Sequence, residues 1–165
     1  MNYHNITVDD MLNGDGLRTV LWVSGCMHHC RGCQNPQTWD EKSGIPFDEA
    51  AKEELFADLS RDYMDGVTFS GGDPLCPANR ETIGRLIAET RDRFPQKTIW
   101  LYTGDLFESF RDTLPFLPLI DVIVDGPYVE ALRDVNLCWR GSKNQRVIDV
   151  KQTLATGKVV LWARN

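Results

Sequence analysis

Segments typical of β-strands alternate with segments typical of α-helices along most of this chain. The expected strands, rich in β-branched and aromatic residues, cover residues 17–24, 66–70, 97–102, 121–125 and 146–150. The expected helices space their apolar residues along one face and cover residues 48–62, 79–94 and 106–114. Such alternation implies right-handed crossovers, so we predict an α/β fold with mostly parallel strands, either an open sheet or a partial β/α barrel. Residues 157–165 are expected to form a last strand or a tail.

Length and charge narrow the class of protein. A chain of 165 residues with 42% hydrophobic residues suits one domain, which we expect to span residues 1–165. The net charge is −6 and no block of Lys or Arg stands out, which argues against a nucleic-acid partner. The N-terminal residues lack a leader pattern and no eighteen apolar residues follow one another, so we expect a cytoplasmic protein without a membrane partner.

Four unusual polar stretches each come directly after an expected strand. They are GCMHHCRGC from Gly25, GGDP from Gly71, YTGD from Tyr102 and DGPY from Asp125. Ligands of parallel sheets bind at the carboxyl ends of the strands. The sequence therefore predicts that these stretches surround one site on one face of the molecule.

The first stretch holds three cysteines, Cys26, Cys30 and Cys33, in the pattern CxxxCxxC. An odd total of five cysteines makes a poor disulfide framework, which favours metal binding in a reducing compartment. An iron–sulfur cubane normally takes four cysteines, so three would leave one iron open to a substrate. A zinc site and a CxxC dithiol at Cys30 and Cys33 remain alternatives.

The second stretch, SGGDP from Ser70, leaves its strand through two glycines. Gly71 and Gly72 allow positive φ angles and a close backbone approach to a ligand, and the loop offers amides and hydroxyls to a zwitterionic amino-acid group. A tight turn capped by Asp73 is the simpler interpretation of this stretch taken alone. Its position one helix after CxxxCxxC makes the pair much more specific than either motif.

Together these motifs resemble the radical S-adenosylmethionine superfamily and, within it, the activating proteins of anaerobic ribonucleoside-triphosphate reductase. The stretches that carry the resemblance are MNYH, GLR, VSGCMHHCRGCQNPQTW, SGGDPL, YTG, VDGPYV and WRGSKNQRV. It extends to about Val150, which implies a compact radical S-adenosylmethionine core over residues about 14–150 and an unassigned tail over 151–165.

The resemblance implies a mechanism and a set of site residues. Cys26, Cys30 and Cys33 would ligate a [4Fe-4S] cluster whose open iron holds S-adenosylmethionine. The other implied cofactor contacts are Gly71, Gly72 and Asp73 to the methionine ammonium group, the backbone at Gly32 and Gln34 beside the adenosyl group, and Thr103 near the carboxylate or ribose. An electron carrier such as flavodoxin would reduce the cluster, and the 5′-deoxyadenosyl radical would take a hydrogen atom from a glycine of the large reductase subunit. No side chain beyond cluster and cofactor is implied as catalytic.

Two other functions remain open at this stage. The nearer one is a small-molecule radical S-adenosylmethionine enzyme such as a compact 7-carboxy-7-deazaguanine synthase, and the other is a zinc-binding interaction module. The remaining site candidates have simple structural interpretations. We expect His28 and His29 to be partly exposed loop residues and Cys76 and Cys138 to be buried thiols. Further lining residues are expected among Asp125, Gly126, Tyr128 and the segment 139–145.

Overall fold

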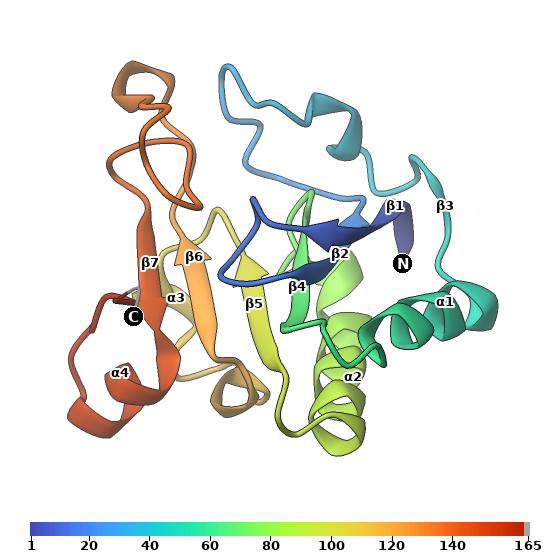
Figure 1. Ribbon diagram of the computed structural model, residues 1–165. Coiled ribbons are helices and arrows are strands. Elements are labelled where there is room, and N and C mark those ends of the chain that lie inside the picture. The colour runs from blue at the N-terminus through green and yellow to red at the C-terminus, as the bar shows by residue number, and fades with distance from the viewer. Residues whose placement is uncertain (164–165) are drawn as a thin grey trace.

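The computed structural model describes residues 1–163 and contains one seven-stranded sheet with the order β3-β1-β2-β4-β5-β6-β7 (Figure 1). The strands are β1 (Asn2–Asp10), β2 (Arg18–Val23), β3 (Ile45–Pro46), β4 (Gly66–Gly71), β5 (Thr98–Tyr102), β6 (Val122–Asp125) and β7 (Arg146–Asp149). The α-helices are α1 (Glu49–Leu59), α2 (Pro77–Arg93), α3 (Phe107–Phe110) and α4 (Val150–Thr156). Short 3₁₀ turns lie at Pro36–Thr38, Leu117–Leu119 and Glu130–Leu132. The predicted α/β class with an open sheet is confirmed, and the partial barrel stays a prediction.

Parallel pairing is confined to the middle of the sheet. Strands β2, β4, β5 and β6 pair in parallel, whereas β1, β3 and β7 add to the edges in antiparallel orientation. Strand β1 was not expected. It is only half-buried and polar, yet it aligns Ile6 with Leu21 and Thr7 with Val20 of β2. The N-terminal segment therefore completes one side of the sheet rather than preceding it.

The two faces of the sheet differ in what covers them. Leu21, Phe69 and Leu101 point from neighbouring strands into the main core, where they pack with the apolar sides of the helices. The opposite face carries a smaller cluster built from Trp100, Val122, Val124 and Val147, with no helix residue in it. Strand residues alternate between faces, and Trp22, Ser70 and Tyr102, near the ends of β2, β4 and β5, line a cavity on this second side.

Local signals explain most helix boundaries. Helix α1 begins after Asp48, whose carboxylate accepts a hydrogen bond from the Ala51 amide at 3.0 Å, and α2 begins with Pro77, a residue suited to the first turn. Helix α4 lies in a segment for which the sequence predicted no element, before the residues expected to form a last strand or a tail. A short helix, capped by Asp149 and ended by Gly157 at φ 71°, precedes an isolated bridge at Leu161, and residues 164–165 of the expected strand lie outside the described residues.

The loops that follow the parallel strands rise from the same edge of the sheet. In Figure 1 the long loop after β2 and the orange segment after β6 stand above this edge, with the turns after β4 and β5 between them. This placement agrees with the general location of ligand sites in parallel sheets. Within residues 1–163, no helix is long and apolar enough to cross a membrane.

Arg18 ties the opposite end of the sheet together. Its guanidinium group is fully buried and donates hydrogen bonds to Thr68 Oγ1 at 2.6 Å, to the Val67 carbonyl at 2.7 Å and to the Thr98 carbonyl at 3.0 Å. Burial lowers the pKa of Arg18 to about 10. The side chain stays charged at neutral pH and cross-links β2, β4 and β5.

Candidate metal and cofactor site

The three cysteines lie in the loop between β2 and the turn at Pro36. Their thiols are free and half-buried, and all three line one cavity of about 850 Å³. The loop turns sharply at His29 and Gly32, whose φ angles are 46° and 72°. The Asn35 amide approaches Cys33 Sγ at 3.4 Å, and burial raises the pKa of the Cys26 thiol to about 11. Metal binding at Cys26 would displace the proton of a thiol that otherwise stays protonated at neutral pH.

The Gly-Gly-Asp loop packs directly against the backbone that precedes Cys26. The Gly72 amide donates to the Val23 carbonyl at 2.7 Å, and the Asp73 amide donates to the Gly25 carbonyl at 2.7 Å. A Cβ atom on Gly72 would lie 2.5 Å from the Gly25 carbonyl oxygen. The glycine at this position is therefore required by the contact between the two loops, an approach that the sequence did not indicate.

Asp73 is the centre of a buried hydrogen-bond network. Its Oδ2 atom accepts hydrogen bonds from His28 Nε2 at 2.7 Å, Thr103 Oγ1 at 3.0 Å and the Gly104 amide at 3.1 Å, while Oδ1 accepts from the Leu75 amide at 2.8 Å. Only 3% of the residue is exposed. The carboxylate therefore joins the cysteine loop, its own loop and the turn after β5.

All of the predicted contact residues line the same cavity as the cysteines. This list holds Gly32, Gln34, Gly71, Gly72, Asp73 and Thr103. Gly126 and Tyr128 complete another side, together with Trp139, Arg140, Gly141 and Gln145. The prediction that the four polar stretches surround one site is confirmed by this lining. Asp125 is not among the lining residues, because its side chain is buried in a different contact.

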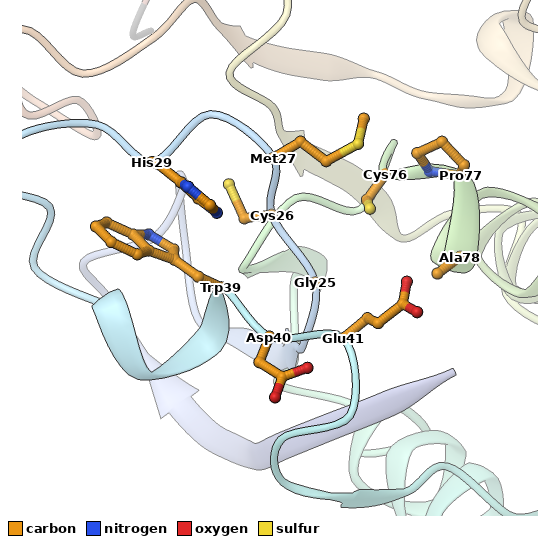
Figure 2. A pocket seen from close by; sticks show the side chains of 10 residues that line it. All are labelled: Gly25, Cys26, Met27, His29, Trp39, Asp40, Glu41, Cys76, Pro77 and Ala78. Carbon is orange, nitrogen blue, oxygen red and sulfur yellow. The ribbon is translucent and has the colours of Figure 1, made fainter.

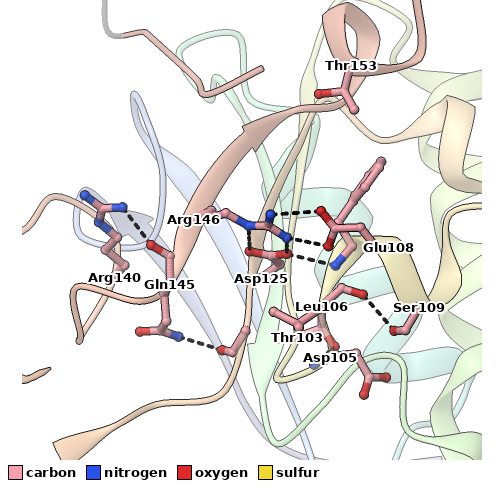
Figure 3. Close-up of polar contacts among 12 residues, drawn as sticks. Thr103, Asp105, Leu106, Glu108, Ser109, Asp125, Arg140, Gln145, Arg146 and Thr153 are labelled. Atoms are coloured by element: carbon pink, nitrogen blue, oxygen red, sulfur yellow. Dashed lines mark hydrogen bonds and ion pairs between the residues drawn. The ribbon is translucent and has the colours of Figure 1, made fainter. Parts of the chain in front are cut away.

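The segment between β6 and β7 is anchored at both of its ends. Figure 3 shows the Arg146 guanidinium between Asp125 and Glu108, with Nε 3.0 Å from Asp125 Oδ1 and Nη1 2.9 Å from Glu108 Oε1. Gln145 Nε2 donates to the Gly126 carbonyl at 3.1 Å, and Gln145 Oε1 accepts from the Gly141 amide at 3.0 Å. Tyr128 and Trp139 are thus held over the cavity by contacts at the base of the segment.

A smaller pocket of about 300 Å³ lies beside the cysteine loop (Figure 2). Cys26 lines both this pocket and the main cavity, whereas Cys76 lines only the smaller one. The ring of His29 stacks on Trp39 with centroids 4.8 Å apart. In Figure 2 the Cys26 sulfur points toward these rings rather than toward Cys76. Cys76 therefore does not join the three thiols of the main cavity.

The number of thiols at the cavity suits an iron–sulfur cluster with three protein ligands, whereas a closed structural zinc site needs four ligands. Among residues 1–163, one group of side chains brings its ligand atoms close enough for a single ion: His28, Asp73 and Asp105 have ligand atoms within 4.8 Å of one another. Neither Cys76 nor Cys138 lines the cavity, so three thiols, and not four, face it.

Comparisons with known proteins agree with this site. A model of the family of 4Fe-4S single cluster domains matches residues 12–148. The anaerobic ribonucleoside-triphosphate reductase-activating protein of Enterobacteria phage T4 is 47% identical over 147 residues, which cover 89% of this chain and 93% of the relative. The protein of that name from Escherichia coli (strain K12) is 44% identical over 150 residues, covering 89% and 97% of the two chains. That from Haemophilus influenzae is 40% identical over 148 residues, covering 88% and 96%.

This chain belongs to the family of anaerobic ribonucleoside-triphosphate reductase-activating proteins. The resemblance inferred from the sequence motifs is thereby confirmed. The 4Fe-4S family match and the three cavity-lining thiols together support an iron–sulfur cluster in this member of the family.

One of the simple structural interpretations is wrong, because Cys138 is exposed rather than buried, whereas Cys76 is buried as expected. His28 is a partly exposed loop residue as expected, with 24% of its side chain exposed. Its ring also makes a hydrogen bond with Asp73, a contact that raises the pKa of His28. Tyr128 lines the cavity, as expected.

Sequence reasoning assigned no role to several residues of the site. Tyr102, the first residue of the YTGD stretch, lines the cavity, and its hydroxyl is buried without a hydrogen-bond partner among the described residues. Burial raises the pKa of Tyr102, so the group acts only as a neutral donor or acceptor. Tyr102 lies two residues after Trp100 on β5, so the two side chains share one face of the sheet, the face of the helix-free cluster. This alternation was the sequence signal that could have placed the Tyr102 side chain at the site. Asn79 was also missed, although its amide binds the Ser24 and Asp73 carbonyls at 2.7 and 2.9 Å.

Proposed function

We propose that this protein is a radical S-adenosylmethionine activase that generates a glycyl radical on anaerobic ribonucleoside-triphosphate reductase. One observation carries the proposal: three thiols, with no fourth cysteine, line the same cavity as the Gly-Gly-Asp loop in a member of this family. The relatives are named for the activation of that reductase. The partner of this chain is accordingly the large catalytic subunit of such an enzyme.

Cys26, Cys30 and Cys33 are the residues proposed to hold the [4Fe-4S] cluster. When bound, the cluster supplies the electron that breaks the S–C5′ bond of S-adenosylmethionine, and a hydrogen atom is then removed from a glycine Cα of the reductase. With three protein ligands, one iron of the cluster would lack a protein ligand and would be open to the methionine amine and carboxylate. The protein contributes position and exclusion of water rather than a reacting side chain.

The Gly-Gly-Asp loop is proposed to receive the methionine ammonium group. Asp73 is only 3% exposed, and the negative charge of its carboxylate favours a cation at this edge of the cavity. Since Oδ2 of Asp73 already accepts three hydrogen bonds, its main contribution is charge and the shape of the loop formed with Gly71 and Gly72. Thr103 uses its hydroxyl to bind Asp73, so we assign it a supporting contact near the cofactor.

The adenosyl group is proposed to lie along the backbone at Gly32 and Gln34. Tyr128 and Gln145 line the other side of the same cavity, and Tyr102 brings an unpartnered hydroxyl into its wall. Such a group is available for a hydrogen bond to a ligand, because a buried hydroxyl without a partner is unfavourable.

The partner's glycine loop is proposed to enter from the helix-free face. Leu12 and Val135 line the cavity there and are 81% and 74% exposed, so apolar side chains border the opening. A reduced flavodoxin is the proposed electron donor, and the free thiols suit the reducing cytoplasm as the place of action.

Anaerobic reconstitution followed by product analysis tests this function. The protein is loaded with iron and sulfide, reduced, and mixed with S-adenosylmethionine with and without the reductase subunit; iron content and 5′-deoxyadenosine are measured. We expect about four irons per chain, loss of iron on Cys30→Ala, and cleavage that increases when the reductase is present. Equal cleavage with and without the reductase would contradict the protein substrate and favour a small-molecule enzyme. Binding of one zinc and no iron would contradict the cofactor.

A further inference from the structure

The side chain of His28 joins the cysteine loop to the carboxylate of the Gly-Gly-Asp loop, in addition to the contacts that Gly25 and Asn79 make at the start of the cysteine loop. His28 Nε2 lies 2.7 Å from Asp73 Oδ2, across 45 positions of sequence. The Asp73 side chain is 4% exposed and the His28 side chain 24% exposed, so water competes little for this contact. A carboxylate only accepts hydrogen bonds when ionised, which identifies Nε2 as the donor. Charge-assisted bonds of this kind are roughly twice as strong as neutral ones.

The ring of His28 also occupies a space that a side chain at position 104 would fill. A Cβ atom on Gly104 would lie 2.3 Å from His28 Cδ2, and the Gly104 amide donates to the same Asp73 oxygen at 3.1 Å. Gly104 does not need its glycine for a left-handed backbone, since its φ angle is not positive. Close packing against the imidazole therefore accounts for a glycine at this position.

The neighbouring histidine makes a different kind of contact. His29 stacks on Trp39, which closes the same loop. Its ring lines the smaller pocket and is not among the residues that line the main cavity. The two adjacent imidazoles therefore offer a matched comparison between a contact inside the loop and a contact between loops.

We propose that His28 is a positioning residue that fixes the cysteine loop relative to the Gly-Gly-Asp loop, and thereby sets where S-adenosylmethionine lies between cluster and loop. This inference rests on the proposed function for the identity of the ligand, but the loop contact itself does not depend on it. Cys26 and Cys30 lie two residues on either side of His28, so a shift of His28 moves two of the three thiols. Asp73 carries the other half of the site.

The expected effect of losing His28 can be estimated from residues that orient the ligands of a metal or cofactor without binding it themselves. Loss of a group that orients a ligating residue typically lowers affinity or activity 10–100-fold. His28→Ala is therefore expected to weaken S-adenosylmethionine binding by about 10-fold or more, while the three thiols still bind iron. His28→Gln retains an N–H donor and is expected to recover most of the affinity.

Two measurements on the whole protein test the proposal. In the metal-free protein, hydrogen–deuterium exchange of residues 26–33 reports the anchor without any cofactor. In the reconstituted protein, the dissociation constant for S-adenosylmethionine and the iron content are measured for wild type, His28→Ala, His28→Gln, His29→Ala and Gly104→Ala. We expect faster exchange and weaker cofactor binding for His28→Ala and Gly104→Ala, near wild-type values for His29→Ala, and unchanged iron content throughout.

The outcomes separate this inference from the proposed function. If His28→Ala exchanges at the wild-type rate and binds the cofactor within about twofold of wild type, the positioning role is wrong. Equal losses in His28→Ala and His29→Ala would also overturn it. If His28→Ala fails to fold, His28→Gln is compared with Gly104→Ala. Near wild-type binding in His28→Gln with weaker binding in Gly104→Ala supports the proposal, and wild-type binding in both overturns it. If wild-type protein does not bind S-adenosylmethionine at all, the proposed function fails, while the exchange rates still decide whether His28 anchors the loop.

Discussion

Replacing Arg146 with Ala is expected to lower the free energy of unfolding by about 3–5 kcal/mol, the range found when one partner of a buried ion pair is removed. Asp125 is fully buried, and its carboxylate is bound by Arg146 Nε and Nη2 and by the Phe107 amide. Without Arg146, a buried negative charge keeps only the amide, at 2.8 Å. The second acidic partner, Glu108, is 51% exposed, so Glu108→Gln is expected to lower stability by only about 1 kcal/mol or less.

Urea unfolding of the metal-free protein, followed by far-ultraviolet circular dichroism, gives both free energies. Arg146→Ala combined with Asp125→Asn should recover part of the loss, because the buried group is then neutral. The reasoning is refuted if Arg146→Ala costs no more than Glu108→Gln, or if neutralising Asp125 gives no recovery. Either result would mean that the base of the segment over the cavity is not held by this ion pair.

Three further predictions concern charge, packing and the thiols. Arg146 lowers the pKa of Glu108 to about 2, so the stability from this pair is present above about pH 4.5 and is lost as the pH falls toward 2. The urea midpoints of wild type and Glu108→Gln should therefore converge on acidification. A difference in midpoint that stays constant with pH would contradict a stabilising pair. Gly72→Ala places a Cβ atom 2.5 Å from the Gly25 carbonyl oxygen and should reduce the iron content. Gly84→Ala, which is not at the cavity, places a Cβ atom 2.7 Å from the Phe116 ring and should lower stability without loss of iron. Equal iron content in both variants would refute the importance of the loop contact. Cys76→Ala should keep the iron that Cys26→Ala loses, and loss in both would place Cys76 among the ligands.

The predictable part of the fold was the part with strong local patterns. Strands β5 and β6 are nearly continuous apolar runs because the main core lies on one of their faces and the second cluster on the other. Strand β4 alternates instead, with Val67 and Phe69 in the main core and Thr68 bound to Arg18 on the other face. Strand β1 escaped prediction because its half-buried, polar sequence is held by pairing with β2 and not by its own pattern. Helix α4 escaped because Val150, Thr153 and Thr156 disfavour helix, and its stability comes from the Asp149 cap and from Lys151 bound to Asp121 at 2.6 Å.

The site was predictable where its residues fall in motifs after strands. Cys26, Cys30, Cys33 and the Gly-Gly-Asp loop meet at one cavity because parallel strands end at one edge. The contact of His28 with Asp73 was not predictable, since no local pattern indicates which loop residue reaches a partner 45 positions away. The buried hydroxyl of Tyr102 likewise becomes visible only when the cavity is known.

The central claim is that the three thiols and the adjoining loop serve to place a radical on a partner's glycine. The most direct measurement is electron paramagnetic resonance of the reductase subunit after anaerobic incubation with the reconstituted protein, a reductant and S-adenosylmethionine. We predict a glycyl radical doublet that collapses when the reductase is made with α-deuterated glycine and that is lost with Cys30→Ala. A fully loaded cluster that cleaves S-adenosylmethionine yet gives no doublet on the reductase would contradict the account.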